Sequence, residues 1–269
     1  MDLHGYNTLI LSDLHLGAET SRAREATRVL KENRFQRLIL LGDIFADLNF
    51  ARLTKEHWKF LGYIRKLSNP KRKIEVVWVE GNHDHGLANI MSHLVGVRVY
   101  ESYEWEYSGL RHVAIHGHQF DGFQVNRVRL SRWGTSMYLQ LQKLDFRSKP
   151  IARLIDRLNT RWLRMSEKVA SGALSHARHH GADRIFCGHT HEAVRVERGG
   201  IEYYNSGGWV DSQLTYLTID ETGVQIHEYS ERADDRDSSE ERGEADSAVA
   251  DFPDETGLLE DVEYESVGG

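Results

Sequence analysis

Short apolar runs in this 269-residue chain end in carboxylate, amide and imidazole side chains. The stretch "VVWVEGNHDHGL" (76–87) shows the pattern: β-branched and aromatic residues stop at a glycine, and Asn82, His83, Asp84 and His85 follow. Such a run predicts a buried β-strand that leads into a polar loop. Because ligands bind at the carboxyl ends of strands in α/β sheets, the pattern constrains the fold and the site together.

Four other apolar runs end in the same way. "LIL" leads to Asp13 and His15, "LILLG" to Asp43, "VAI" to His116, and "RIFCG" to His189 and His191. With Asn82, these side chains provide enough donors for two divalent metal ions if one carboxylate is shared. Mixed carboxylate, amide and imidazole ligands favour Mn²⁺, with Fe or Zn²⁺ as alternatives, and the lack of thiolates argues against a structural zinc site. Two ions about 3.5–4 Å apart would activate water for attack on a phosphoryl group.

The hydrophobic periodicity predicts an α/β fold. Strands over 8–16, 37–43 and 74–82 alternate with helices over 21–33, capped by Ser21, and 55–67, which is the rhythm of parallel crossovers. Six later runs are short strands with glycine-rich turns, and they predict a second, partly antiparallel sheet. They cover 112–117, 184–188, 193–198, 201–205, 214–220 and 224–229.

Charge and composition predict how the chain is divided. Residues 1–230 form one expected domain with a net charge of +5, and it includes a basic helical insertion over 124–180 with 12 Lys and Arg against 3 acids. Residues 231–269 hold 15 acids against 3 Arg, which predicts a disordered acidic tail. A single cysteine and an N-terminus with neither a signal-peptide layout nor a spanning run predict a cytoplasmic protein.

The order Asp-x-His, Gly-Asp, Gly-Asn-His-Asp, His and Gly-His-Thr-His resembles the motif series of the calcineurin-like metallophosphoesterases, from Leu9 to Tyr229. The resemblance implies a two-sheet αββα sandwich. It also implies the ligands: Asp13, His15 and His191 for one ion, Asn82, His116 and His189 for the other, and Asp43 as the bridge. A metal-bridged hydroxide would attack phosphorus, His83 would assist the leaving group, and Asp84 would orient His83.

A finer likeness is to the branch that contains UDP-2,3-diacylglucosamine hydrolase, a lipid A pathway enzyme. The stretches "LSDLHLG", "LLGDIF", "IHGHQFD" and "YYNSGGWVDS" carry it. It implies a phosphoesterase or pyrophosphatase that acts on a nucleotide-sugar lipid. Two alternatives remain open: a phosphodiesterase or nucleotidase with a soluble substrate, and a non-catalytic interaction scaffold.

The insertion over 124–180 bears on the partner. Its predicted helix places Ile151, Leu154, Leu158 and Trp162 on one face, with arginines around the rest. Such a helix can contact a membrane surface peripherally or cover acyl chains, and the alternative is a cap that only packs on the sandwich. A body charge of only +5 and the lack of an aromatic stacking platform argue against nucleic acid.

Overall fold

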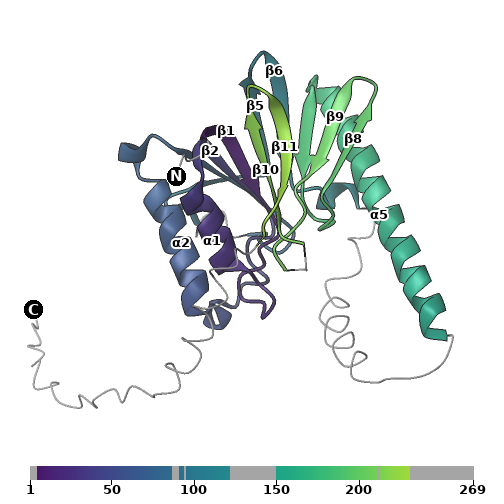
Figure 1. Cartoon of the computed structure of the whole chain (residues 1–269), viewed down its shortest axis with the longest axis horizontal. Helices are drawn as coiled ribbons and strands as arrows, with labels where there is room; N and C mark the ends of the chain where they lie inside the picture. The colour runs from purple at the N-terminus through teal and green to yellow at the C-terminus, as the bar shows by residue number, and fades with distance from the viewer. Residues whose placement is uncertain (1–4, 87–90, 94, 122–149, 211–212, 231–269) are drawn as a thin grey trace, which may run out of the picture. The chain divides into compact units, whose positions relative to one another are not determined.

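The computed structural model describes residues 5–86, 91–93, 95–121, 150–210 and 213–230, and only the backbone of residues 150–164. The chain from Met1 to Tyr229 forms one compact unit (Figure 1). The predicted tail, 231–269, and the first part of the predicted insertion, 124–149, lie outside the described residues. Within the described residues, no helix is both long enough and apolar enough to cross a membrane.

The first sheet has six strands in the order β11-β10-β1-β2-β3-β4. Four strands run parallel: β1 (Gly5–Leu11), β2 (Arg34–Leu41), β3 (Glu75–Val79) and β4 (Arg98–Tyr100). Two strands are antiparallel at the β1 side: β10 (Thr215–Asp220) and β11 (Gly223–Glu228). Two helices connect successive parallel strands: α1 (Ala23–Glu32) after β1 and α2 (Lys55–Leu67) after β2.

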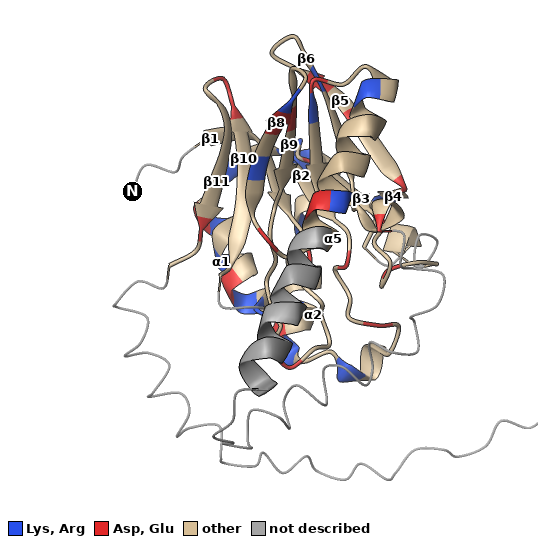
Figure 2. Cartoon of the chain, turned by 90° about the vertical axis from the view of Figure 1, so that its right-hand side faces the viewer, with Lys and Arg blue, Asp and Glu red and all other residues tan. Residues whose placement is uncertain are grey.

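The second sheet has five strands in the order β5-β6-β7-β9-β8. Their bounds are β5 (Ser102–Tyr107), β6 (Leu110–Ile115), β7 (Arg184–Cys187), β8 (Val194–Arg198) and β9 (Ile201–Asn205). The three central strands are parallel, and β5 and β8 pair antiparallel at the edges. The long helix α5 (Pro150–His180) runs along this sheet (Figure 2). Three short 3-10 helices complete the elements: η1 (Phe50–Arg52), η2 (Pro70–Arg72) and η3 (His118–Phe120).

Successive side chains of a strand point to opposite faces of its sheet, and each face packs into a different hydrophobic core. On β1, Leu9 and Leu11 pack with the helices α1 and α2, whereas Ile10 packs with Phe186 and Tyr204 of the second sheet. On the far side of the second sheet, Ile185 and its neighbours pack against α5. The layers are therefore α, β, β and α, and the predicted two-sheet α/β sandwich is confirmed.

Two local expectations need correction. The run 214–229 forms β10 and β11, which extend the first sheet rather than the second because Leu217 and Ile219 pack with Ile10 between the sheets. Ser21 is not the N-cap of α1, which begins at Ala23. The hydroxyl of Ser21 instead donates to the Leu14 carbonyl at 2.7 Å, so it fixes the loop that leaves β1.

Candidate metal centre

The centre lies where five strands from both sheets end. Asp13 follows β1, Asp43 follows β2, Asn82 follows β3, His116 follows β6, and His189 and His191 follow β7. Backbone hydrogen bonds join the loops: the Asp13 amide donates to the Gly42 carbonyl at 3.0 Å, and the Gly188 amide donates to the His116 carbonyl at 3.0 Å. The loops after β1 and β2 are thus held to each other, and so are the loops after β6 and β7.

One group of possible ligands consists of Asp13, His15 and His191, whose ligand atoms lie within 4.8 Å of one another. Asp13 Oδ1 is 3.3 Å from Nε2 of His191 and 3.9 Å from Nε2 of His15. The two imidazole Nε2 atoms are themselves 3.2 Å apart. Three electron-pair donors that converge in this way suit a shared cation.

A second group consists of Asp43, His116 and His189. His116 Nε2 is 3.3 Å from Asp43 Oδ2, and both side chains are buried. Asn82 belongs with this group by sequence, and its carbonyl oxygen is buried without a hydrogen-bond partner among the described residues. A buried amide oxygen without a partner costs stability, so its position is explained best by a ligand that it would contact.

Asp43 also belongs to a third group, with His15 and His83, so it lies between the other two groups. Both aspartates are held in the same manner, because one oxygen of each accepts a backbone hydrogen bond while the other faces imidazoles. Asp43 Oδ1 accepts from the His83 amide at 2.8 Å, and Asp13 Oδ2 accepts from the His189 amide at 3.0 Å. The backbone therefore fixes the oxygen that is turned toward the ligand groups.

Five of the seven predicted ligands adopt a left-handed backbone conformation. The φ values are 52° for Asp13, 47° for His15, 50° for Asp43, 68° for His189 and 55° for His191. This region is uncommon for residues other than glycine, and such residues cluster at functional sites. The left-handed turns direct the side chains from the strand ends toward one another.

Two glycines make room for the aspartates. A Cβ atom on Gly81 would lie 2.2 Å from Asp43 Oδ1, and one on Gly188 would lie 2.4 Å from Asp13 Oδ2. Real Cβ atoms do not approach other atoms so closely, so any side chain here would displace a carboxylate. This close approach requires glycine at positions 81 and 188.

The electrostatics are those of paired carboxylates and imidazoles in a buried site. Burial favours neutral His116, but the neighbouring carboxylates of Asp43 and Asp13 outweigh it and raise the pKa of His116 to about 9. Burial dominates for His15 and lowers its pKa to about 4. Burial of Asp43 is outweighed by His116 and His15, so the pKa of its carboxyl lies below its usual range. Ionised Asp43 and neutral His15 are already in the forms that bind divalent cations, whereas His116 would have to release a proton when it binds one.

His83 and Asp84 have different surroundings. The Nδ1 atom of His83 lies 2.6 Å from the Ala46 carbonyl, and its Nε2 atom lies 3.9 Å from Asp43 Oδ2. The carboxylate of Asp84 instead accepts hydrogen bonds from the backbone amides of Ile44, at 3.0 Å, and Phe45, at 2.9 Å. Asp84 therefore fixes the loop that carries Asp43, whereas the resemblance implied that it orients His83.

Two residues of "IHGHQFD" also lie at the centre, although the sequence reasoning did not assign them. The His118 ring centroid is 5.4 Å from that of His116 and 6.4 Å from that of His189. Asp121 Oδ2 lies 3.5 Å from His189 Nε2, where it can fix that imidazole. Their positions two and five residues after the predicted ligand His116 are the sequence signal that could have identified them. His85, in contrast, is exposed beside Glu80.

The chain belongs to the calcineurin-like phosphoesterase family, whose model matches residues 6–193. Among curated proteins, a search by sequence found no match. Among solved structures, the phosphoesterase YfcE from E. coli is 16% identical, with a TM-score of 0.45 over 80% of this chain and 88% of that one. An archaeal phosphodiesterase is 14% identical, with a TM-score of 0.44 over 82% and 99%. A single mutant of Vps29 from Entamoeba histolytica is 14% identical, with a TM-score of 0.41 over 84% and 99%.

Proposed function

We propose that this chain hydrolyses a phosphodiester or pyrophosphate bond at the centre described above. The observation that carries the proposal is the convergence of carboxylate and imidazole donors from five strand ends into three adjoining groups, which are linked through His15 and Asp43. The buried carbonyl oxygen of Asn82, which has no hydrogen-bond partner among the described residues, adds an amide donor. A single structural ion would need only about four ligands. Seven donors fit a pair of divalent ions, with Mn²⁺ as the proposed metal and Fe or Zn²⁺ as alternatives.

Each side chain has a proposed role. Asp13, His15 and His191 would hold one ion, Asn82, His116 and His189 the other, and Asp43 both. Two ions held there would supply Lewis-acid stabilisation of the phosphoryl oxygens and an activated water. His83, fixed by the Ala46 carbonyl beside Asp43, would donate a proton or a hydrogen bond to the leaving group.

The finer proposal concerns the substrate. We infer a nucleotide-linked lipid such as UDP-2,3-diacylglucosamine, on the basis of the motifs "LSDLHLG", "LLGDIF" and "YYNSGGWVDS" and the basic insertion that precedes β7. Membrane contact through 124–180 and the lipid A pathway belong to this proposal. A soluble phosphodiester is the competing substrate.

The test is hydrolysis by the full chain reconstituted with Mn²⁺, Fe²⁺ or Zn²⁺. The panel holds an aryl phosphodiester, a nucleotide sugar and its diacylated form, and Asp43→Asn is the control that lacks the shared ligand. The proposed hydrolase activity is supported if the wild type hydrolyses at least one substrate and Asp43→Asn does not. A preference for the diacylated nucleotide sugar supports the lipid substrate. Metal binding without turnover of any member by the wild type would favour the scaffold.

A further inference from the structure

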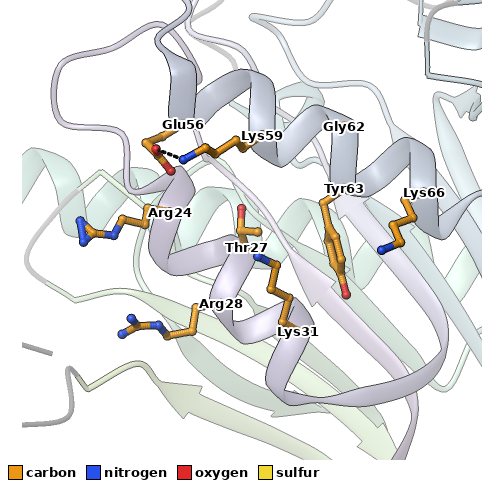
Figure 3. A pocket seen from close by; sticks show the side chains of 9 residues that line it. All are labelled: Arg24, Thr27, Arg28, Lys31, Glu56, Lys59, Gly62, Tyr63 and Lys66. Carbon is orange, nitrogen blue, oxygen red and sulfur yellow. Dashed lines mark hydrogen bonds and ion pairs between the residues drawn. The ribbon is translucent and has the colours of Figure 1, made fainter. Parts of the chain in front are cut away.

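A basic groove lies between α1 and α2 (Figure 3). None of the residues that line it belongs to the metal centre. Its cavity has a volume of about 440 Å³. Both helices contribute to its walls: Arg24, Thr27, Arg28 and Lys31 from α1, and Glu56, Lys59, Gly62, Tyr63 and Lys66 from α2. We call this cavity the α1–α2 groove.

The α1–α2 groove is strongly positive. Five of its lining side chains are cations and one, Glu56, is an acid, which gives a net charge of +4. Glu56 Oε1 is already engaged by Lys59 Nζ at 2.6 Å. Cations lie on both walls, with Lys31 on α1 and Lys66 on α2, and Lys31 Nζ is 5.7 Å from the centre of the Tyr63 ring. Like charges gathered in one cavity repel each other, and an anionic ligand would relieve the repulsion.

The walls of the groove are fixed by the core beneath them. Ala26 and Leu30 of α1 and Phe60 and Ile64 of α2 are buried in the cluster under the helices. At Gly62, a Cβ atom would meet no other atom within 4 Å, so the cavity is open there. A cavity formed in advance of binding loses little conformational entropy when a ligand enters.

We propose that the α1–α2 groove binds a ligand that carries several phosphate groups. A single phosphate would fill little of a cavity of this size, which lies within the range of small-molecule sites. Each phosphate monoester carries about −1.5 to −2 charges at pH 7, so two or three would neutralise the groove, whereas an acidic peptide would need four carboxylates. Arg24 offers a planar donor pair that suits phosphate, whereas Arg28 already donates to the Tyr229 hydroxyl at 3.2 Å. This proposal is independent of the metal centre.

The test compares two matched double variants of the full chain. Lys31→Gln with Lys66→Gln removes one cation from each wall, and Lys71→Gln with Lys168→Gln removes two exposed cations outside the groove. Binding of inorganic tripolyphosphate is measured by calorimetry in metal-free buffer, because tripolyphosphate chelates metal ions. The wild type and the outer variant should bind within about twofold of each other, and the groove variant should bind about tenfold more weakly. Thermal melting checks that all three are folded.

A second arm separates the sources of the phosphates. The wild type and both double variants are sedimented with phosphatidylglycerol vesicles and with phosphatidylcholine vesicles. Membrane headgroups are identified if the wild type and the outer variant bind only the phosphatidylglycerol vesicles and the groove variant binds neither kind. Tripolyphosphate binding alone would identify a soluble ligand, and either result supports the proposal. The proposal would be overturned if the two double variants bound tripolyphosphate with equal affinity. It would also be overturned if the wild type bound polyglutamate and not tripolyphosphate.

Discussion

His83 is the residue at the centre whose chemistry depends most on one backbone contact. The Ala46 carbonyl beside Nδ1 favours a proton on that nitrogen and leaves Nε2 on the side of Asp43. An imidazole held in this way can stabilise charge on a leaving group without holding a metal ion. This role separates it from the seven predicted ligands, and the separation can be measured.

We expect His83→Ala to keep its metal ions and to lose about 10²–10⁴ in kcat. The loss should shrink for an aryl phosphodiester, whose leaving group needs little protonation. Metal analysis and kinetics on good and poor leaving groups check this, with the exposed neighbour in His85→Ala as a control expected to stay within about twofold. Equal losses on all substrates would remove the proton-donor role and leave charge stabilisation.

Asp84 should behave as a structural residue. Its carboxylate accepts from the amides of Ile44 and Phe45, and an amide side chain cannot accept at both of its atoms. We expect Asp84→Asn to lower the free energy of unfolding by about 1–3 kcal/mol and to weaken metal binding through the loop that carries Asp43. Urea denaturation and metal titration measure both. Unchanged stability with a rate loss like that of His83→Ala would instead support the orienting role.

At the scale of elements, the sequence predicts the buried parallel strands well because their apolar runs are long and end in distinctive residues. The sheet to which 214–229 belongs was not predictable from a single sequence, because short antiparallel strands can pair with any open edge and only the packing of Leu217 and Ile219 decides. Ser21 was misassigned because a hydroxyl near a helix start can bond to a preceding loop as well as to the helix. The left-handed backbone conformation of the five predicted ligands could not be recognised from the sequence.

The pairing of β5 with β6 gives the fold a pH dependence that is separate from the metal centre. His112 on β6 lies beside both Trp105, with ring centroids 5.0 Å apart, and Phe186, at 5.8 Å. Burial lowers the pKa of His112 to about 4, compared with 6.5 for an unfolded histidine. Between these values the unfolded chain binds the proton more readily, so the stabilisation is complete above about pH 6.5 and is lost as the pH falls toward 4.

The variant His112→Phe tests this contribution, because a phenyl ring keeps the stacking and removes the titrating group. Between pH 7 and pH 5 we expect the wild type to lose about 1–2 kcal/mol more unfolding free energy than the variant. Urea denaturation at both pH values measures the difference. Parallel losses in the two proteins would show that His112 titrates normally in the fold.

At the scale of the whole molecule, the described chain on either side of 122–149 passes beside the centre. Asp121, the last described residue before it, lies 3.5 Å from His189 Nε2. On the returning helix, Ser166 Oγ donates to Glu192 Oε2 at 2.9 Å, next to His191. The later part of α5 is also part of the core, where Ala173 and Ala177 are buried. An exchange of 124–149 therefore removes no core residue that the structure describes.

We expect a Gly/Ser linker in place of 124–149 to leave hydrolysis of a small aryl phosphodiester within about tenfold, because none of the predicted ligands is removed. Activity on a diacylated nucleotide sugar should fall much further, mainly through KM if the lost contacts bind substrate and transition state equally. Kinetics on both substrates with the folded variant check this. Proportional losses would show that the segment only supports the sandwich.

The left-handed ligands have a consequence for how such a chain would change over generations. Holding Asp13, His15, Asp43, His189 and His191 at positive φ costs about 1 kcal/mol or more each, and a glycine at the same place avoids the strain. Selection for the proposed hydrolysis would then be what keeps these residues in the chain. A lineage released from that selection would drift toward glycine or asparagine at these positions and gain heat resistance as it lost its ions. The two-sheet fold would then persist after the proposed activity was lost.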